Sequence, residues 1–241
     1  EYAYLDKLPD GTLPQSDVLM REREAVHDER SLLRYAEHRI ASLADHHAIT
    51  GSSFADSWAV VPTYTDLWVV FDDGRYVIDA VRPESPASQA GIQSGQQITA
   101  IDGVPVARAV ASFWSAMELD VTPQRAAYAA RVLVAGRRDR ERRIVIRVNS
   151  GTERPVVLPS LYAAADVPKL PLSVCTANGM TIIRFNNALG DRETIAAFDA
   201  AMGSFDTDTN LALDLRDTPS GGNTTIARAI MGWFVERPHG Y

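Results

Sequence analysis

Apolar residues near the start of the chain recur with helical spacing. Four of them repeat every seven residues and three more fill the same stripe: Leu19, Val26, Leu33 and Ile40, with Leu32, Ala36 and Leu43. This spacing places apolar side chains on one face of an α-helix. With Ser16 as its N-cap, the pattern predicts one amphipathic helix over residues 16–44 that packs against a core. A coiled coil with a partner helix is the alternative interpretation.

Shorter apolar runs, separated by turn residues, follow over the next hundred residues. We expect strands over 58–61, 67–71, 75–81, 97–101, 143–148 and 152–158, and helices over 108–119 and 123–134. The pair Asp73-Gly74 suits a tight hairpin turn between two of these strands. The pattern therefore predicts a strand-rich domain over 58–158, preceded by a helical segment over 1–57.

The pattern changes again after a proline-containing stretch. Pro159, Pro168 and Pro171 indicate a linker over 159–172. The expected elements beyond it are strands over 180–185 and 210–215 and helices over 191–202 and 223–235. A strand–helix–strand order favours parallel pairing with a right-handed crossover. Overall the chain is predicted to be α+β, and because two parallel strands do not make a covered sheet, we expect residues 173–241 to be part of a larger α/β core.

Composition excludes several classes of function. The 241 residues are 46% hydrophobic and 23% charged, which is enough apolar material for a sizeable core. A formal net charge of −7 disfavours nucleic acid as a partner, because phosphate binding needs a basic face. No apolar run is long enough to predict a membrane span. The single cysteine, Cys175, excludes an internal disulfide or a thiolate metal cluster, and we expect neither a metal nor an organic cofactor.

The clearest motif lies at 81–106. It contains, in order, a helix N-cap followed by proline, a left-handed helix end, a short buried strand and a tight turn. The residues are Ser85 and Pro86, Gly91, Ile98 and Ile101, and Asp102-Gly103. This order resembles the PDZ domain in its bacterial arrangement, over about residues 64–158 with an insertion after 106.

PDZ domains bind a peptide C-terminus as an added strand and hold its carboxylate on backbone N–H groups of a glycine-containing loop. The corresponding segment here, 66–69, has no glycine, and we expect Asp66 to repel a carboxylate. Strand addition needs only backbone, so the resemblance assigns peptide binding to Leu67, Trp68 and Val69. A PDZ fold that serves as a spacer or lid is the alternative.

A second motif joins an apolar strand at 211–215 to Gly221-Gly222 and a helix. Such a turn places free N–H groups at the carboxyl edge of a sheet, where they can bind a phosphate or a developing oxyanion. The Lys-Ser/Thr pair of a phosphate loop and the dinucleotide glycine pattern are both missing. Asp214 and Arg216 alternate on the strand and therefore share a face, which predicts an ion pair that organises the turn.

Taken together, the helical segment, the PDZ motif and the Asp-Leu-Arg…Gly-Gly strand resemble the C-terminal processing (tail-specific) serine peptidases and their tricorn-like relatives. The resemblance implies that Gly221 or Gly222 donates to the oxyanion. Tricorn-like members take a histidine base from a motif before the PDZ domain, and Asp45-His46-His47-Ala48 occupies that place. His47 matches the base and His46 is the second choice; a histidine that interacts with a helix C-terminus is the alternative.

In this family the nucleophilic serine lies well past the Gly-Gly turn, and nothing after Gly222 matches it. The only lysines, Lys7 and Lys169, match no catalytic position, so a Ser–Lys dyad is not expected. The resemblance thus implies the N-terminal half of a serine endopeptidase that cleaves peptides or protein C-terminal tails, outside the cytoplasm of a bacterium. The alternatives are a non-catalytic PDZ module that binds peptides, and a carrier of apolar small molecules on a peptidase-like core. The sequence leaves the oligomeric state open.

Overall fold

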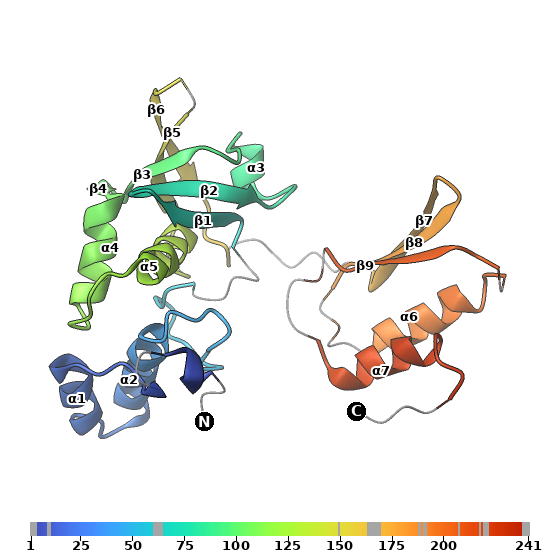
Figure 1. Ribbon diagram of the computed structural model, residues 1–241, viewed down its shortest axis with the longest axis horizontal. Helices are drawn as coiled ribbons and strands as arrows, with labels where there is room; N and C mark the ends of the chain where they lie inside the picture. The colour runs from blue at the N-terminus through green and yellow to red at the C-terminus, as the bar shows by residue number, and fades with distance from the viewer. Residues whose placement is uncertain are drawn as a thin grey trace. The chain divides into compact units, whose positions relative to one another are not determined.

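The computed structural model forms two compact units, Glu1–Ala165 and Asp166–Tyr241, and each is described by itself (Figure 1). The described residues are 4–8, 11–59, 65–148, 150–162, 170–187, 189, 192–206, 208–216, 218 and 222–237. The boundary between the units falls inside the stretch that the prolines mark as a linker. The α+β class predicted from the sequence is confirmed.

The helical segment at the start of unit 1 contains two helices, so the prediction of one continuous helix is wrong. After a short 3₁₀ turn, η1 (Leu5–Lys7), come α1 (Asp17–Glu24) and α2 (Glu29–Ala41). The break has a local cause: Asp28 is extended and caps α2 in a capping box with Ser31. Ser16 caps α1 as expected, since its side chain accepts from the N–H of Leu19.

An antiparallel sheet forms the centre of unit 1. Its strands are β1 (Leu67–Asp72), β2 (Arg75–Val81), β3 (Gln97–Ile101), β4 (Val104–Pro105), β5 (Arg142–Arg147) and β6 (Glu153–Leu158). The strand order is β1-β2-β3-β5-β6, with β4 paired to β3, so β1 lies at an edge. Asp73 and Asp102 adopt left-handed backbone angles (φ 46° and 49°), which fits the tight turns predicted at Asp-Gly. Trp58 makes only an isolated bridge to Arg137, and Ala59 lies in no strand. Residues 60 and 61 of the strand expected there lie outside the described residues.

Three helices accompany this sheet: α3 (Pro86–Gln89), α4 (Val106–Ser115) and α5 (Pro123–Ala135). Helix α5 packs along β1 and against α4, as Figure 1 also shows. The core between them is fully apolar at its centre, where the largest buried side chains include Trp114, Tyr128, Leu67, Ile78 and Ile146. The edge strand and α5 therefore belong to one packed framework.

Unit 2 is a three-stranded sheet with two helices. The strands are β7 (Leu172–Ala177), β8 (Met180–Phe185) and β9 (Leu211–Asp214), in that order, and the helices are α6 (Glu193–Met202) and α7 (Thr224–Gly232). Strands β8 and β9 are parallel, which confirms the pairing expected from the strand–helix–strand order. Strand β7 was not predicted: most of its side chains are exposed, so it carries no apolar alternation. It pairs with β8 through the turn at Asn178-Gly179, where both backbone angles are left-handed.

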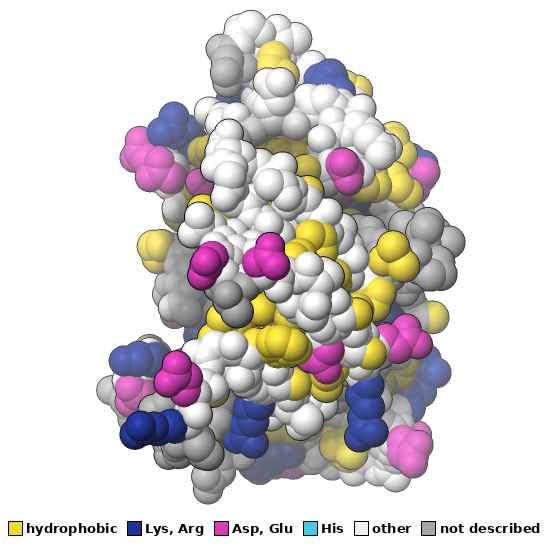
Figure 2. Space-filling model, turned by 90° about the vertical axis from the view of Figure 1, so that its right-hand side faces the viewer, with side chains coloured by type: hydrophobic (Ala, Val, Ile, Leu, Met, Phe, Trp, Pro, Cys, Tyr) yellow, Lys and Arg dark blue, Asp and Glu magenta, His cyan; other side chains and the backbone are white. Residues whose placement is uncertain are grey.

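The core of unit 2 is small. It consists of Ile183, Phe185, Phe198, Ile226 and Ile230. Other apolar side chains stay exposed, among them Val174, Met180, Leu213, Leu215, Met231, Trp233, Phe234 and Val235. Figure 2 shows apolar side chains at the surface on this side of the molecule, interspersed with charged ones.

Candidate functional site

The two histidines that follow α2 lie in different environments. The side chain of His47 is 94% exposed, with Nδ1 3.4 Å from Oδ1 of Asp45. The backbone N–H of His47 donates to the same carboxylate oxygen at 2.8 Å, which fixes Asp45 beside it. An accessible imidazole oriented by a carboxylate is the arrangement that a general base requires. Helix α2 ends at Ala41, six residues before His47, so the alternative of a histidine at the helix end does not fit.

His46 packs as an aromatic side chain instead. Its ring stacks on Tyr128 of α5, with centroids 4.5 Å apart, and lies 5.8 Å from the ring of Trp68 on β1. Burial, with the nearby Asp45 as a second cause, raises the pKa of Tyr128 well above its ordinary value. His46 thus ties the loop that carries His47 to the framework of β1 and α5.

The candidate peptide-binding segment is the edge strand β1. The side chains of Leu67 and Val69 are fully buried, so these two residues can meet a peptide only through their backbone. Arg131 of α5 already uses part of that backbone: its Nε donates to the carbonyl of Val69 at 2.7 Å. The guanidinium of Arg131 also stacks over the ring of Trp68, 3.8 Å from the ring centroid. Sequence analysis missed Arg131, since a single arginine in a helix carries no distinguishing pattern.

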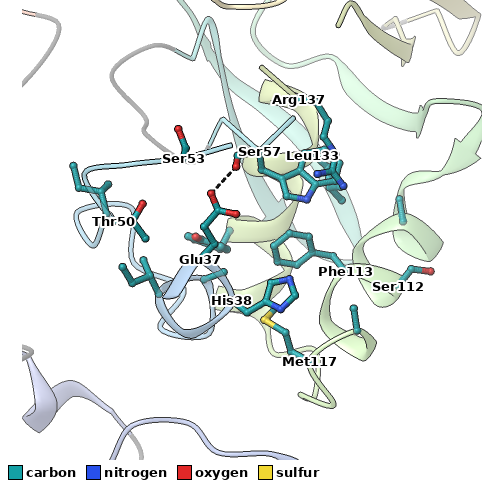
Figure 3. A pocket seen from close by; sticks show the side chains of 17 residues that line it. Glu37, His38, Thr50, Ser53, Ser57, Ser112, Phe113, Met117, Leu133 and Arg137 are labelled. Atoms are coloured by element: carbon teal, nitrogen blue, oxygen red, sulfur yellow. Dashed lines mark hydrogen bonds between the residues drawn. The ribbon is translucent and has the colours of Figure 1, made fainter. Parts of the chain in front are cut away.

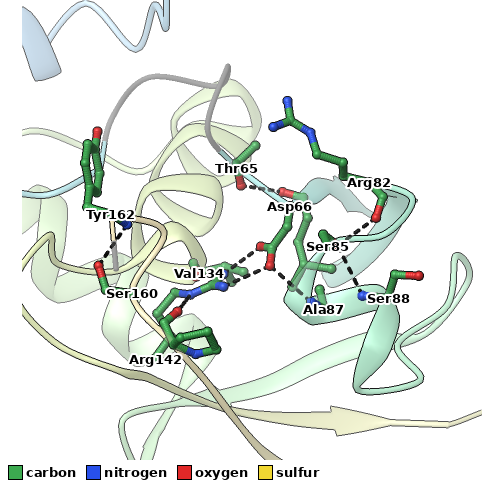
Figure 4. Close-up of polar contacts among 12 residues, drawn as sticks. Thr65, Asp66, Arg82, Ser85, Ala87, Ser88, Val134, Arg142, Ser160 and Tyr162 are labelled. Carbon is green, nitrogen blue, oxygen red and sulfur yellow. Dashed lines mark hydrogen bonds and ion pairs between the residues drawn. The ribbon is translucent and has the colours of Figure 1, made fainter. Parts of the chain in front are cut away.

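The expectation that Asp66 repels a carboxylate is wrong. Asp66 is 2% exposed and makes a bidentate ion pair with Arg142 of β5, at 2.6 and 2.8 Å (Figure 4). Its carboxylate also accepts the backbone N–H of Ala87 in the first turn of α3, at 3.2 Å. Because the guanidinium neutralises this charge inside the protein, Asp66 joins β1, β5 and α3 rather than facing a ligand.

The turn of unit 2 that contains Gly222 has no room for a side chain at that position. A Cβ on Gly222 would lie 2.4 Å from Cβ and 2.7 Å from the carbonyl oxygen of Leu189, so no other residue fits without a shift. The following N–H, of Asn223, is taken by that same carbonyl at 2.5 Å, while the Asn223 side chain caps α7 through Thr225. Gly221 lies outside the described residues. Gly222 is therefore the candidate oxyanion donor that the structure describes.

Asp214, at the end of β9, anchors the chain before this turn. Its carboxylate accepts from Nε and Nη2 of Arg216, both at 2.8 Å, from the Arg216 backbone N–H at 3.1 Å, and from Nε of Arg184 at 2.9 Å. These bonds, those from Arg216 above all, hold the pKa of Asp214 well below its ordinary range. The predicted ion pair is thus present, with Arg184 of β8 as a third member that the sequence pattern did not reveal.

A cavity of about 430 Å³ lies within unit 1 (Figure 3). Its walls come from α2, from residues 49–58, and from α4 and α5. The lining is largely apolar, with Ile40, Ile49, Trp58, Phe113, Met117 and Leu133 among its members. The carrier hypothesis placed a ligand on the peptidase-like core, whereas this cavity lies in the other unit.

The predicted site residues fall into two groups. Leu67, Trp68, Val69 and the two histidines belong to unit 1, where His46 and Trp68 come together; Gly222, Asp214 and Arg216 belong to unit 2. Within the described residues, no three His, Cys, Asp or Glu side chains are placed to hold a metal ion. No helix in that part of the chain has the length and apolar character needed to cross a membrane.

The chain matches one family profile and is similar to several solved structures. The PDZ domain family profile matches residues 77–113, from β2 into α4. No curated protein matches the chain by sequence. Among solved structures, it is similar to a photosystem II D1 C-terminal processing protease, at 17% identity and a TM-score of 0.40, over 90% of this chain and 58% of that one. It is also similar to mature CPAF complexed with lactacystin, at 16% identity and a TM-score of 0.41, over 88% and 51%.

A third likeness is to an S41 protease from Bacteroides fragilis, at 18% identity and a TM-score of 0.28, over 89% of this chain and 58% of that one. The chain thus spans little more than half the length of these proteins. The first and third of them are by name a C-terminal processing protease and an S41 protease, and the sequence motifs resemble the C-terminal processing peptidases.

Proposed function

We propose that the chain belongs to a serine endopeptidase of the C-terminal processing type, in its tricorn-like branch, which cleaves peptides or protein tails. The observation that carries the proposal is the turn after β9. Asp214 fixes the strand end, Leu189 leaves room only for glycine at 222, and a helix begins directly afterwards. Backbone N–H groups at such a helix start can stabilise an oxyanion.

His47 is the general base in this proposal. Because Asp45 lies on its Nδ1 side, Nε2 is the nitrogen that would accept the proton of a serine hydroxyl and return it to the leaving amine. Gly222, with Gly221 as the other candidate, would donate to the oxyanion. No residue of this sequence is assigned as the nucleophile. Neither metal nor cofactor enters the mechanism, and the resemblance favours a site of action outside the cytoplasm of a bacterium.

The test is covalent labelling of the full-length protein with a fluorophosphonate, which reacts with an activated serine nucleophile. We expect one adduct, and a His47→Ala variant should lower the labelling rate by about 10²- to 10⁴-fold, the usual contribution of a general base. His27→Ala is the matched control, because His27 is also exposed in unit 1 but bonds only within its own loop and helix start. Absence of an adduct, or equal rates in both variants, would contradict the proposal.

The second candidate function is a non-catalytic module that binds peptides at β1. It is favoured by the position of β1 at the sheet edge, where the strand has a neighbour on one side only. Peptide binding without any fluorophosphonate adduct would support this function and would contradict the serine peptidase proposal. Under either function the molecule that binds, as substrate or as ligand, is a peptide or protein C-terminus.

A further inference from the structure

The cavity of unit 1 has two charged side chains of opposite sign on its walls. Glu37 comes from α2, and Arg137 follows α5. Among the described residues, the carboxylate of Glu37 meets only the hydroxyl of Ser57, at 2.5 Å, and no cation. The guanidinium of Arg137 bonds the backbone carbonyl of Asp56 at 2.9 Å and stacks over Trp58. In the same described part of the chain it makes no ion pair within 4.0 Å, and the nearby Asp139 acts on it only at longer range.

Contacts with the segment 54–58 hold both charged side chains in position. The hydroxyl of Ser57 that bonds Glu37 also accepts the backbone N–H of Phe54, at 2.8 Å, so the carboxylate is tied to the turn at 54–57. Arg137 is fixed at the next residues of the same segment, by Asp56 and by the face of Trp58. Both charged side chains are held in position and form no ion pair. A ligand of opposite charge would therefore bind with little loss of side-chain entropy.

The rest of the lining is mainly apolar, and its polar members are neutral hydroxyl groups and His38, whose Nδ1 lies 2.8 Å from the carboxylate of Glu22. Ile40 and Ile49 come from the N-terminal segment, and Phe113, Met117 and Leu133 from α4 and α5. A volume of about 430 Å³ is within the range of small-molecule sites. In Figure 3 the carboxylate of Glu37 and the ring of Phe113 face the same space from opposite sides.

We propose that this cavity binds a small zwitterion with an apolar body, namely a short apolar peptide of dipeptide size with free amino and carboxyl ends. Glu37 receives the ammonium group, Arg137 receives the carboxylate, and the apolar side chains fill the space between α2 and the helices α4 and α5. A simple hydrocarbon leaves both charges without partners, and a ligand with only one charged end satisfies one of them. This site is separate from the proposed peptidase chemistry and does not depend on it.

The ligand would also bridge two parts of unit 1. One wall is the segment at 49–58, which continues the loop that holds His46 and His47, and the opposite wall is α4 and α5. Binding should therefore stabilise the attachment of this loop and raise the melting temperature of the protein.

Calorimetric titration with three related compounds tests the proposal on the full chain: leucyl-leucine, its N-acetyl derivative and its C-terminal amide. We expect leucyl-leucine to bind, and each derivative to bind about tenfold more weakly or worse, since each loses one charge-assisted contact. Absence of leucyl-leucine binding at millimolar concentration would overturn the proposal. Equal affinity for all three compounds would overturn it as well.

Two variants locate the site. Glu37→Gln keeps an acceptor for Ser57, and should abolish the preference for leucyl-leucine over its acetyl derivative while leaving the preference over the amide. Arg137→Gln should do the reverse. Arg131→Gln, which removes the hydrogen bond to the carbonyl of Val69 on β1, is the control and should change neither preference. If Arg131→Gln changes the affinity for leucyl-leucine in either direction and the other two variants do not, the dipeptide binds at β1 and the cavity proposal fails.

Discussion

Each unit holds a carboxylate with arginine, and the two sites differ in how far solvent reaches the arginines. In unit 1 the side chains of Asp66 and Arg142 are 2% and 1% exposed. In unit 2 Asp214 is 6% exposed, but Arg216 is 81% and Arg184 43% exposed. The first pair is sealed in the framework of the PDZ-like sheet. The second fixes one strand end and leaves positive charge at the surface beside the proposed oxyanion turn. The same kind of ion pair is thus sealed from solvent in one unit and largely open to solvent in the other.

The largest loss of stability should come from breaking the buried ion pair between Asp66 and Arg142. Asp66→Asn keeps the shape of the side chain but leaves the Arg142 charge buried without compensation, and we expect a loss of about 3–5 kcal/mol in the free energy of unfolding. Urea denaturation of the full chain measures it. Asp72→Asn is the control, because the Asp72–Arg75 pair is exposed and 3.9 Å apart, and should change stability by less than about 1 kcal/mol. A similar loss in both variants would mean that Asp66 is not sealed.

The next effect concerns the glycine turn of unit 2. In Gly222→Ala the new Cβ would overlap Leu189, including its backbone carbonyl, so we expect a loss of about 1–3 kcal/mol in the free energy of unfolding. Gly232→Ala is the matched control, since nothing lies within 4 Å of a Cβ at that helical position. That control should be neutral or stabilising by up to about 1 kcal/mol. If both variants behave alike, Leu189 does not select glycine at 222.

These contacts show where sequence patterns suffice and where they fail. Strands and turns of unit 1 follow from apolar alternation and from Asp-Gly pairs, which act over a few residues. Asp66 and Arg142 are 76 residues apart, and Gly136, whose Cβ would lie 2.6 Å from the Arg142 side chain, makes room for them. No local pattern encodes such a contact. Strand β7 was missed for another reason, because a strand with little buried surface leaves no periodic signal.

For the candidate site, motif order identified the histidine loop, the PDZ segment and the glycine turn, but not how each residue is used. His46 and His47 are neighbours in sequence, and only the fold separates a ring stacked on Tyr128 from one in solvent. Arg184 and Arg131 reach Asp214 and Val69 from neighbouring elements. Such partners depend on which strands and helices pack together, which composition and spacing do not specify.

A smaller effect should appear at Asp214 as a dependence on pH. Because its pKa is lowered in the folded state, the ionised form contributes stability at pH values above the ordinary value of 3.8. This contribution should be lost as the pH falls below 3.8 toward the lowered pKa. Unfolding curves between pH 2 and 6 should therefore converge for the wild type and Asp214→Asn at the acidic end, and separate above about pH 4. Parallel curves would mean that Arg216 and Arg184 do not hold the carboxylate.

The smallest effect is expected at the edge of unit 1, where Arg131 competes with any added strand for the carbonyl of Val69. One net hydrogen bond contributes about 0.5–1.5 kcal/mol, so Arg131→Gln, whose shorter side chain should free that carbonyl, should raise the affinity for an extended peptide by about two- to tenfold. Fluorescence anisotropy with a labelled peptide that has an apolar C-terminus measures it. Arg125→Gln is the control, because Arg125 lies on the same helix but bonds Asp120 and stacks on Trp114, away from the edge. A weaker affinity in Arg131→Gln alone would mean that this arginine holds the peptide, and that an arginine rather than a glycine loop receives the carboxylate at this PDZ-like edge.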